Sequence, residues 1–360
     1  MEPVRVAVVG TGNIARLHAE ALGRLGDEVR LVGAVDVDGA RLSAFCDRYD
    51  VPARHPDLAG LLEKEQPELV HICTPPGSHH ELALACLRAG SNVLVEKPPT
   101  LNLAELEELV AAERRYGAAL ATVFQHRFGT GALRLRAMLD AGVLGRPLVA
   151  VCHTTWLRTQ DYFDVEWRGR WDTEGGGPTM GHGIHQMDLL CAILGDWTEV
   201  SALARQQARR SETEDLSMAH VSFANGAVAS VVNSLLSTRE ESYLRFDFER
   251  ATVELTHLYG YGDDDWRITP APEYTDEVLA AWRAGAAGVR SSHQAQFAEV
   301  VRSLRAGTPP PVSSVEARRT MRLVAGVYAS AFTRRPVGPA DLTEASPFHR
   351  RMQGDGPRWS

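Results

Sequence analysis

Short apolar runs alternate with helical patterns over the first third of the chain. Val4–Val9 and Val29–Val35 are apolar runs of strand length, and Asn13–Leu25 between them carries apolar residues at helical spacing. The alternation continues to about Phe124, with a further apolar strand at Ser91–Glu96. Because strands that alternate with helices are typical of right-handed βαβ units, we predict a parallel Rossmann sheet over residues 1–124.

The pattern changes after Phe124. Leu148–Thr154 is predicted to be a strand, and alternating apolar positions precede the dipeptide Asn225-Gly226. This dipeptide favours a hairpin turn because both of its positions accept positive φ. Apolar residues alternate with polar ones again over 244–248, so one face of the predicted sheet is apolar.

Two helical patterns follow, at His293–Ala306 and Val315–Phe332. We therefore predict an α/β fold whose second domain, over residues 125–346, is built on a largely antiparallel open sheet with helices on one side. The remaining face of that sheet is a candidate subunit interface. The tail over 347–360 is predicted to be poorly ordered.

Composition excludes several classes of function. The formal net charge of −8 over 360 residues, with no concentrated basic segment, argues against a nucleic-acid surface. No apolar run is long enough to span a membrane, and a core strand begins almost at once, which leaves no room for a signal peptide. The five cysteines show neither paired motifs nor metal spacing. We expect a cytoplasmic protein with buried free thiols.

The segment Gly10-Thr11-Gly12-Asn13-Ile14-Ala15 joins the first strand to the first helix, as a dinucleotide-binding turn does. Gly10 permits the tight turn, and Gly12 lets backbone N–H groups approach a pyrophosphate at the helix N-terminus. The alternative is a turn whose glycines serve only the strand-to-helix geometry.

Asp36 ends the second strand, where a carboxylate is expected to accept the ribose hydroxyls of NAD. This carboxylate would repel the 2′-phosphate of NADP, so NAD is the predicted cofactor. The nearest arginine, Arg41, is predicted to lie on the following helix. The alternative for Asp36 is an N-cap of that helix.

Glu96-Lys97-Pro98 closes the strand at Ser91–Glu96. A lysine at the end of a strand of a dinucleotide-binding sheet indicates hydride chemistry. Oxidation of a secondary alcohol needs a base for the hydroxyl proton and a cation or donor on the developing alkoxide. The alternative for Lys97 is a lysine whose ammonium extends from a strand end into solvent.

The order and spacing of these motifs resemble the glucose–fructose oxidoreductase and inositol dehydrogenase family, written Gfo/Idh/MocA. The resemblance covers nearly the whole chain. The matching segments are the Gly10-to-Ala15 turn with His18, Thr74-Pro75-Pro76 with His79, Glu96-Lys97-Pro98, Arg127 after a strand at Thr122–Phe124, and Gly175-Gly176-Gly177 leading to Gly183, His185 and Asp188. The resemblance implies hydride transfer on sugars, cyclitols or related polyols by a homodimer or homotetramer.

The resemblance also implies roles for individual residues. Lys97 would hydrogen-bond the reacting oxygen beside the nicotinamide, and His185 would take the proton at a pKa near working pH. The alternative for His185 is a histidine satisfied within the core. The predicted cofactor contacts are Gly10, Gly12, Asn13, Ile14, Asp36, Thr74, Pro75, His79, Glu96 and Lys97. The predicted substrate contacts are Arg127, Trp156, Tyr162, Trp167, His182 and Asp188.

Some of these substrate residues also stand out by chemistry. Trp156, Tyr162 and Trp167 crowd the stretch before the glycine run, and aromatic faces stack on the C–H side of a sugar ring. Anchoring of a loop to the second core is the equal alternative. Asp188 lies one helical turn after His185, where it would orient the imidazole, bind a hydroxyl or make a structural hydrogen bond.

One position departs from the family pattern. Many members carry Asp or Asn four residues before the histidine, on the same helical face, and here that residue is Gly181. His182 beside it is expected to point about 100° around the helix. The missing carboxylate is expected to change substrate choice more than to abolish activity. No metal is predicted, because the pairs His79-His80 and His182/His185 lack a third ligand at zinc spacing.

Three hypotheses follow for the function. The first is an NAD-dependent dehydrogenase of a polyhydroxylated small molecule. The second is an enzyme that keeps NAD tightly bound and uses it transiently for glycoside cleavage, elimination or epimerisation. The third, a nucleotide-binding regulator without turnover, is disfavoured by the presence of both Lys97 and His185.

Overall fold

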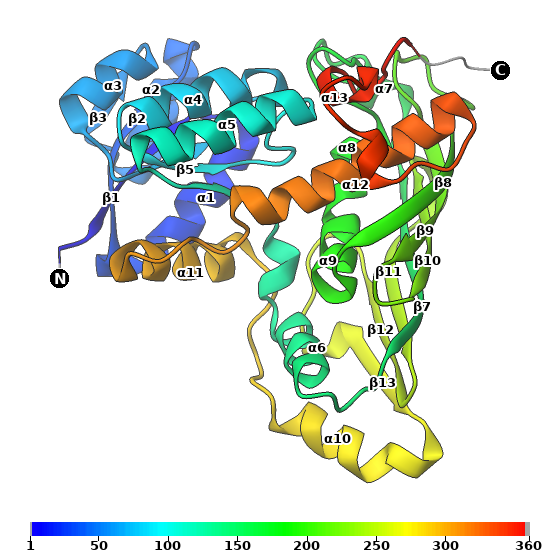
Figure 1. Cartoon of the computed structure of the whole chain (residues 1–360). Coiled ribbons are helices and arrows are strands. Elements are labelled where there is room, and N and C mark those ends of the chain that lie inside the picture. Colours follow the sequence, from blue (N-terminus) through cyan, green and yellow to red (C-terminus); the bar gives the residue numbers. More distant parts are fainter. Residues whose placement is uncertain (1, 357–360) are drawn as a thin grey trace. The chain divides into compact units, whose positions relative to one another are not determined.

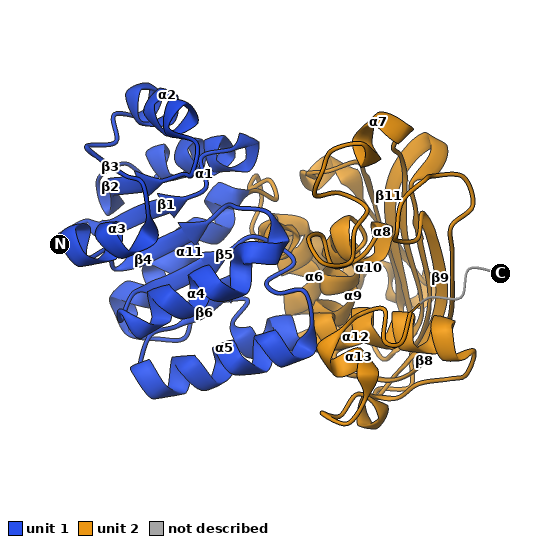
Figure 2. Ribbon diagram, turned by 90° about the horizontal axis from the view of Figure 1, so that it is seen from above, with its two compact units in different colours: residues 1–124, 293–318 blue, residues 125–292, 319–360 orange. Residues whose placement is uncertain are grey.

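The computed structural model describes residues 2–356, which form two compact units. Unit 1 comprises residues 1–124 and 293–318, and unit 2 comprises residues 125–292 and 319–360 (Figure 2). The second domain was predicted as the continuous range 125–346. In the structure residues 293–318 instead belong to unit 1, so the chain leaves the Rossmann unit and returns to it.

Unit 1 is a six-stranded parallel sheet with strand order β3-β2-β1-β4-β5-β6 (Figure 1). Its strands are β1 (Val4–Val9), β2 (Val29–Val35), β3 (Ala53–His55), β4 (Leu69–Ile72), β5 (Asn92–Val95) and β6 (Leu120–Thr122). Its helices are α1 (Asn13–Gly23), α2 (Gly39–Tyr49), α3 (Leu58–Glu65), α4 (His79–Arg88), α5 (Leu103–Tyr116) and α11 (His293–Ala306). This arrangement confirms the predicted Rossmann sheet.

The returning helix α11 completes the core of unit 1. Phe297, Val300 and Val301 of α11 are buried in one cluster with Leu22 of α1 and Leu94 of β5. The strand expected at Thr122–Phe124 ends two residues earlier, because the N–H of Phe124 donates to the side chain of Gln296 at 3.0 Å instead of to a strand.

Unit 2 is built on a mixed, mostly antiparallel seven-stranded sheet with strand order β13-β12-β11-β7-β10-β9-β8. Its strands are β7 (Pro147–Leu157), β8 (Trp197–Arg205), β9 (Leu216–Phe223), β10 (Val228–Ser234), β11 (Leu236–Phe248), β12 (Ala251–His257) and β13 (Trp266–Pro270). Its helices are α6 (Thr130–Asp140), α7 (Gln160–Phe163), α8 (Pro178–Gly181), α9 (Ile184–Leu194), α10 (Thr275–Ala284) and α13 (Pro347–Arg350), and α12 (Ser314–Thr333) runs from unit 1 into unit 2.

The sequence patterns account for this second sheet. Asn225-Gly226 lies in the turn of the antiparallel hairpin β9–β10, as predicted. Leu244, Phe246 and Phe248 are buried on one face of β11. Only the pairing of β10 with β7 is parallel in this sheet.

The other face of the sheet carries exposed apolar side chains. Val149 of β7 pairs with Val228 of β10, and Leu203 of β8 pairs with Met218 of β9; these four side chains are all exposed. The face could serve an interface between copies of the chain. The expected homodimer or homotetramer stays a prediction, which the molar mass in solution would check.

The tail differs from its prediction. Residues 347–350 form α13, and Phe348 and Met352 are buried, so this part of the tail is packed rather than poorly ordered. Residues 357–360 of the predicted tail lie outside the described residues. All five cysteines are buried free thiols. Among the described helices, none combines the length and apolar character that crossing a bilayer requires.

Candidate functional site

The predicted cofactor residues gather at one edge of the unit 1 sheet. Gly10 follows β1, Asp36 follows β2, Thr74 lies just beyond β4, and Glu96 follows β5. Because these strands are parallel, their carboxyl ends meet at the same edge. In such sheets the strand order reverses near the centre. Ligands bind in the crevice that this reversal leaves at the carboxyl edge.

Glycine suits positions 10 and 12 of the turn for different physical reasons. Gly10 has φ +83°, and a Cβ there would lie 2.7 Å from the Thr74 side chain, so the protein itself requires glycine. A Cβ on Gly12 would meet no atom within 4 Å. The open space beside Gly12 therefore fits an outside ligand that approaches the backbone, as a pyrophosphate would.

The N-terminus of α1 is suited to an anion. Asn13 and Ile14 are its first two residues, no side chain caps it, and its first turn holds no acidic residue. The unpaired N–H groups and the helix dipole are then available to phosphate oxygens. These features fit a dinucleotide at the turn.

Asp36 holds the turn from the side. Its Oδ2 accepts the N–H of Thr11 at 2.7 Å and the Thr11 hydroxyl at 2.8 Å, and its Oδ1 accepts the N–H of Asp38 at 2.9 Å. Burial alone would raise the pKa of Asp36, but these donors outweigh burial and lower it. A carboxylate has about four acceptor positions. Three are in use, so Asp36 can accept one ribose hydroxyl directly without giving up a present bond.

The alternative that Asp36 caps the next helix is wrong. Asp38 caps α2, since its Oδ1 accepts the N–H groups of Ala40 and Arg41 at 3.0 Å each. Arg41 lies on α2, as predicted, and its Nη1 lies 3.9 Å from Asp36 Oδ2. Arg41 is half-exposed there, so a cation stands beside the carboxylate that is expected to choose between NAD and NADP.

His79 joins two segments of the edge. Its Nδ1 lies 2.7 Å from the carbonyl of Pro98, and its Nε2 lies 2.8 Å from the carbonyl of Thr74. The ring is fully buried and holds the Thr74 and Pro98 loops together, while its direct contact with the cofactor stays a prediction. Carbonyls only accept, so both contacts are hydrogen bonds only when the ring is doubly protonated. Burial is the strongest influence and lowers the pKa of His79, although both carbonyls and Glu96 act in the opposite direction.

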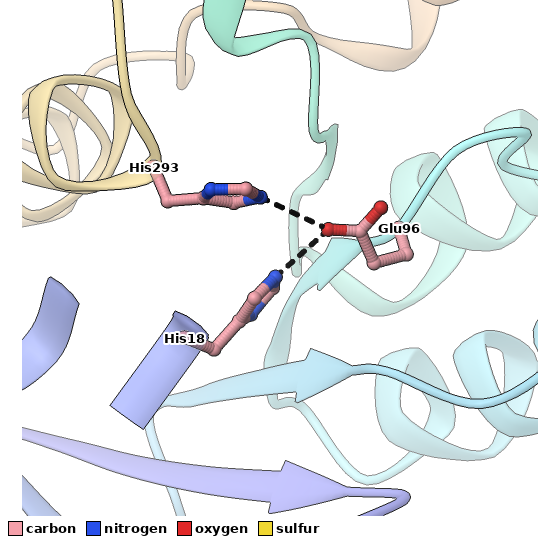
Figure 3. Close-up of side chains that lie close together, drawn as sticks. All are labelled: His18, Glu96 and His293. Atoms are coloured by element: carbon pink, nitrogen blue, oxygen red, sulfur yellow. Dashed lines mark hydrogen bonds and ion pairs between the residues drawn. The ribbon is translucent and has the colours of Figure 1, made fainter. Parts of the chain in front are cut away.

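Glu96 is the centre of a buried cluster that the sequence analysis did not identify (Figure 3). His18 Nε2 lies 2.9 Å from Glu96 Oε1, and His293 Nε2 lies 3.4 Å from the same oxygen. His18 Nδ1 also lies 2.9 Å from Nδ1 of His71. The donor atoms of His18, Glu96 and His293 lie within 4.8 Å of one another, as metal ligands do. The contact between His18 and Glu96 has the length of a hydrogen bond, which accounts for their approach without an ion.

In unit 2, two predicted substrate residues form an ion pair with each other. Arg127, from the short helix Gln125–Phe128, donates through Nε at 2.7 Å and through Nη2 at 2.6 Å to the two carboxylate oxygens of Asp188. The hydroxyl of Thr320 donates to Asp188 at 2.9 Å, and Asp188 is fully buried. The Asp188 carboxylate therefore holds α9 against Arg127, as the structural alternative expects, while its contact with the substrate stays a prediction.

His185 lies at the start of α9 beside a network of neutral histidines. Gln186 Nε2 lies 3.3 Å from His126 Nδ1 and 3.1 Å from His257 Nε2. An amide nitrogen only donates, so both ring nitrogens accept. His126 Nε2 therefore carries the proton that it donates to the carbonyl of Tyr259 at 2.6 Å. The His126 and His185 rings lie 4.9 Å apart, so the immediate ring neighbour of His185 is uncharged.

The helix assumed around Gly181 is broken. Helix α8 ends at Gly181, and His182 has φ −125° and ψ −57°, so residues 181 and 185 do not share one helical face and the predicted direction of His182 does not hold. A second finding changes the meaning of the glycine. A Cβ on Gly181 would lie 3.5 Å from Oε1 of Glu174, so a buried carboxylate stands beside the position that lacks one.

The predicted aromatic contacts belong largely to a loop that anchors itself. Trp156 is buried and donates through Nε1 to Ser242 at 3.1 Å, and His182 Nε2 lies 3.4 Å from the Tyr162 hydroxyl. Arg168 stacks over Tyr162 at 4.0 Å and over Trp167 at 4.2 Å. Tyr162 and Trp167 are half-buried. They keep surface for a ligand, whereas Trp156 fits the anchoring alternative better.

The glycine run before α8 has a steric cause. A Cβ on Gly176 would lie 2.2 Å from the Tyr328 hydroxyl, and one on Gly177 would lie 1.9 Å from the carbonyl of Glu214. The buried Glu214 carboxylate accepts the N–H groups of Gly177 and Thr179 at 3.1 Å each. The run therefore fixes the chain just ahead of His185.

The fold and the two sites define a class, the two-domain oxidoreductases that bind a dinucleotide on a Rossmann unit. Residues 4–124 match the profile described as "Oxidoreductase family, NAD-binding Rossmann fold", and residues 132–256 match the Gfo/Idh/MocA C-terminal domain. The chain belongs to the Gfo/Idh/MocA oxidoreductase family. Its first unit is an NAD(P)-binding domain.

Two similar proteins are named as dehydrogenases of a glucoside and of an inositol. The chain is 28% identical to the D-glucoside 3-dehydrogenase of Escherichia coli K12, over 71% of this chain and 79% of that protein. It is 26% identical to the myo-inositol 2-dehydrogenase of Thermotoga maritima, over 64% and 68% of the two chains. The dehydrogenase WlbA of Chromobacterium violaceum, crystallised with NADH and UDP-GlcNAcA, superposes with a TM-score of 0.82 at 26% identity, covering 94% of this chain and 96% of that one.

Proposed function

We propose that the protein is an NAD-dependent dehydrogenase that oxidises a secondary alcohol of a sugar, a sugar conjugate, a cyclitol or a related polyol. The observation that carries the proposal is Lys97 at the carboxyl edge of the Rossmann sheet, where the Glu96 carboxylate accepts its N–H at 3.2 Å and His79 holds the carbonyl of Pro98. The names of the relatives support the substrate class.

The composition of the chain strengthens the assignment of Lys97. Of the 38 basic residues 36 are arginine, and the only lysines are Lys64 and Lys97. Arginine is always charged in proteins, whereas a lysine ammonium can lose its proton and form a compact hydrogen bond. A chain that uses arginine almost everywhere but keeps lysine at position 97 is consistent with a need for this chemistry there.

The two proposed catalytic residues have separate tasks. When bound at this edge, the nicotinamide supplies the hydride acceptor. Lys97 would donate a hydrogen bond to the oxygen of the substrate carbinol and stabilise the charge that develops on it. His185 would take the hydroxyl proton. The ring of His126, 4.9 Å from that of His185, accepts a hydrogen bond from Gln186 in its neutral form, so it adds no positive charge of its own.

Asp36 would select NAD by accepting a ribose hydroxyl through its remaining acceptor position. Its lowered pKa keeps it ionised at neutral pH, and an anion at this place repels a 2′-phosphate. The guanidinium of Arg41, 3.9 Å away, weakens that repulsion. The preference for NAD over NADP is therefore expected to be moderate.

A screen in heavy water tests the proposal. The purified protein is incubated with NAD and with pools of glucosides, UDP-sugars and cyclitols, while nicotinamide absorbance and product mass are followed together. Reduced cofactor with a product two hydrogens lighter supports a dehydrogenase. Solvent deuterium in a product without net cofactor reduction identifies transient use of tightly bound NAD instead.

Two matched variants then test the lysine. Lys97→Arg keeps the positive charge but changes its size and removes its ability to give up a proton, so turnover should fall by at least about 10²-fold with little change in NAD affinity. Lys64→Arg, on the exposed surface of α3, is the control and should retain full turnover. Normal turnover by Lys97→Arg would remove Lys97 from the mechanism.

A further inference from the structure

Glu96 is a buried carboxylate on which several elements of unit 1 converge. Its Oε1 is contacted by His18 from α1 and by His293, the first residue of α11 (Figure 3). Its Oε2 accepts the main-chain N–H of Lys97 at 3.2 Å. The side chain of Glu96 is 8% exposed, and those of His18 and His293 are 0% and 10% exposed. The three side chains are therefore almost entirely shielded from water and contact one another instead.

The charge on Glu96 is maintained by its partners. Burial by itself would raise the pKa of Glu96, but the hydrogen bonds from His18 and His293 outweigh it and hold the pKa well below its usual value. The titratable groups around the carboxylate, besides Lys97, are His18 on α1, His71 on β4, Cys73 after β4, His79 on α4 and His293 on α11. Two of these groups, His18 and His293, place a ring nitrogen against Glu96, so an anion at Glu96 is the consistent charge state.

The same carboxylate binds the main chain at residue 97. Glu96 and Lys97 are adjacent, and the bond from Lys97 N–H to Oε2 turns the carboxylate along the chain toward residue 97. A lysine ammonium on its flexible four-carbon stem stays within electrostatic range of a group so placed, because a low-dielectric surrounding screens charges much less than water does. The carboxylate thus fixes the main chain of Lys97, and both Glu96 and Lys97 act on the buried ring of His79, whose pKa Glu96 raises and Lys97 lowers.

We propose that Glu96, clamped by His18 and His293, is a positioning residue for Lys97: it fixes the main chain at residue 97 and keeps a buried negative charge beside the ammonium. The inference rests on the proposed function in one respect, that Lys97 is the reacting lysine. The inference adds that helix α1, which follows the dinucleotide-binding turn, and helix α11 both act on Lys97 through the carboxylate of Glu96.

The scarcity of lysine makes a direct test possible. Reductive methylation with ¹³C-formaldehyde labels only Lys64, Lys97 and the N-terminal amine, and Lys64→Arg assigns the two side-chain signals. The titration midpoint of the Lys97 ammonium is then read from the pH dependence of its methyl resonance. No substrate is required.

The variants are Glu96→Gln and the control Glu65→Gln. Glu65 makes a similar contact with a histidine in the same unit, 3.0 Å from His55 Nε2 of β3, and three strands separate β3 from β5 in the sheet. Glu96→Gln should lower the Lys97 midpoint by about one unit, since loss of a neighbouring anion favours the neutral amine. Glu65→Gln should leave it unchanged.

An unchanged Lys97 midpoint in folded Glu96→Gln protein overturns the proposal. If that variant does not fold, the triple variant H18L/E96L/H293L replaces it, because a buried ionic cluster exchanged as a whole for apolar side chains commonly keeps the fold. The same lowered midpoint is expected there, and an unchanged one again refutes the inference. The proposed function fails separately, through normal turnover of Lys97→Arg, so the two failures are distinguishable.

Discussion

Acid should destabilise unit 2 through His257, a buried histidine that is held neutral. Its Nε2 accepts the Gln186 amide at 3.1 Å, and burial lowers its pKa to about 4. The unfolded chain binds this proton near the ordinary value of about 6.5. Between these two values the unfolded state carries more protons than the folded one, so stability is fully present above pH 6.5 and is lost as the pH falls toward 4.

The two pKa values set the size of the effect. On going from pH 8 to pH 5, the histidine should cost about 2 kcal/mol of unfolding free energy. His257→Gln cannot take up the proton, and its amide oxygen can still accept from Gln186. The acid-induced loss of stability should therefore be smaller in His257→Gln than in the wild type by about 2 kcal/mol.

Urea unfolding followed by tryptophan fluorescence isolates the relevant part of the protein. The six tryptophans among residues 2–356 all lie in unit 2, so the signal reports that unit. His220→Gln, an exposed position on β9, is the control and should behave as the wild type. An equal loss in His257→Gln and wild type would mean that neither burial nor the Gln186 contact keeps His257 neutral.

Two further predictions concern single atoms of the sites. Gly183→Ala places its Cβ 1.7 Å from Asn233 Oδ1 and should cost at least about 2 kcal/mol in the same urea assay, whereas Gly181→Ala meets nothing closer than 3.5 Å and should change stability by less than about 1 kcal/mol. Equal costs for the two variants would contradict the packing described for the start of α9. Asp36→Ala should weaken NADH binding about tenfold or more, measured by NADH fluorescence, and NADPH binding less. An unchanged ratio of the two affinities would restrict Asp36 to holding Thr11 and Asp38.

The Rossmann edge could be predicted from sequence because its signals are local. A strand, its last residue and the turn after it occupy consecutive positions, so Gly10, Asp36 and Lys97 were placed correctly at strand ends. What each side chain touches was less predictable. Asp36 bonds to Thr11 and Asp38 because the loops after β1 and β2 meet in space, and spacing alone did not distinguish this from a helix cap.

Unit 2 shows more clearly which contacts the sequence patterns did not predict. Arg127 and Asp188 were assigned to the substrate separately, although opposite charges that are both expected near one site can satisfy each other. Their pairing depends on how the Gln125–Phe128 turn packs against α9, a contact across 61 residues of sequence. The break at His182 was missed because Gly181 and Gly183 sit inside an otherwise helical pattern, where glycine lowers helix propensity without specifying where a helix ends.

The returning segment explains why the first unit could not be delimited from its own residues. β6 is the edge strand of the sheet, and its exposed backbone groups need partners. The Gln296 side chain supplies two, by donating to the Thr122 carbonyl at 2.7 Å and accepting the N–H of Phe124, and the carbonyl of Val312 accepts the N–H of Thr122 at 3.0 Å. Residues 1–124 thus lack both the cover of their edge strand and His293, the second clamp of Glu96. Helix α11, which covers the edge of the sheet, also carries His293, which contacts Glu96 beside Lys97. The same helix therefore completes the fold of unit 1 and helps to organise its candidate catalytic edge.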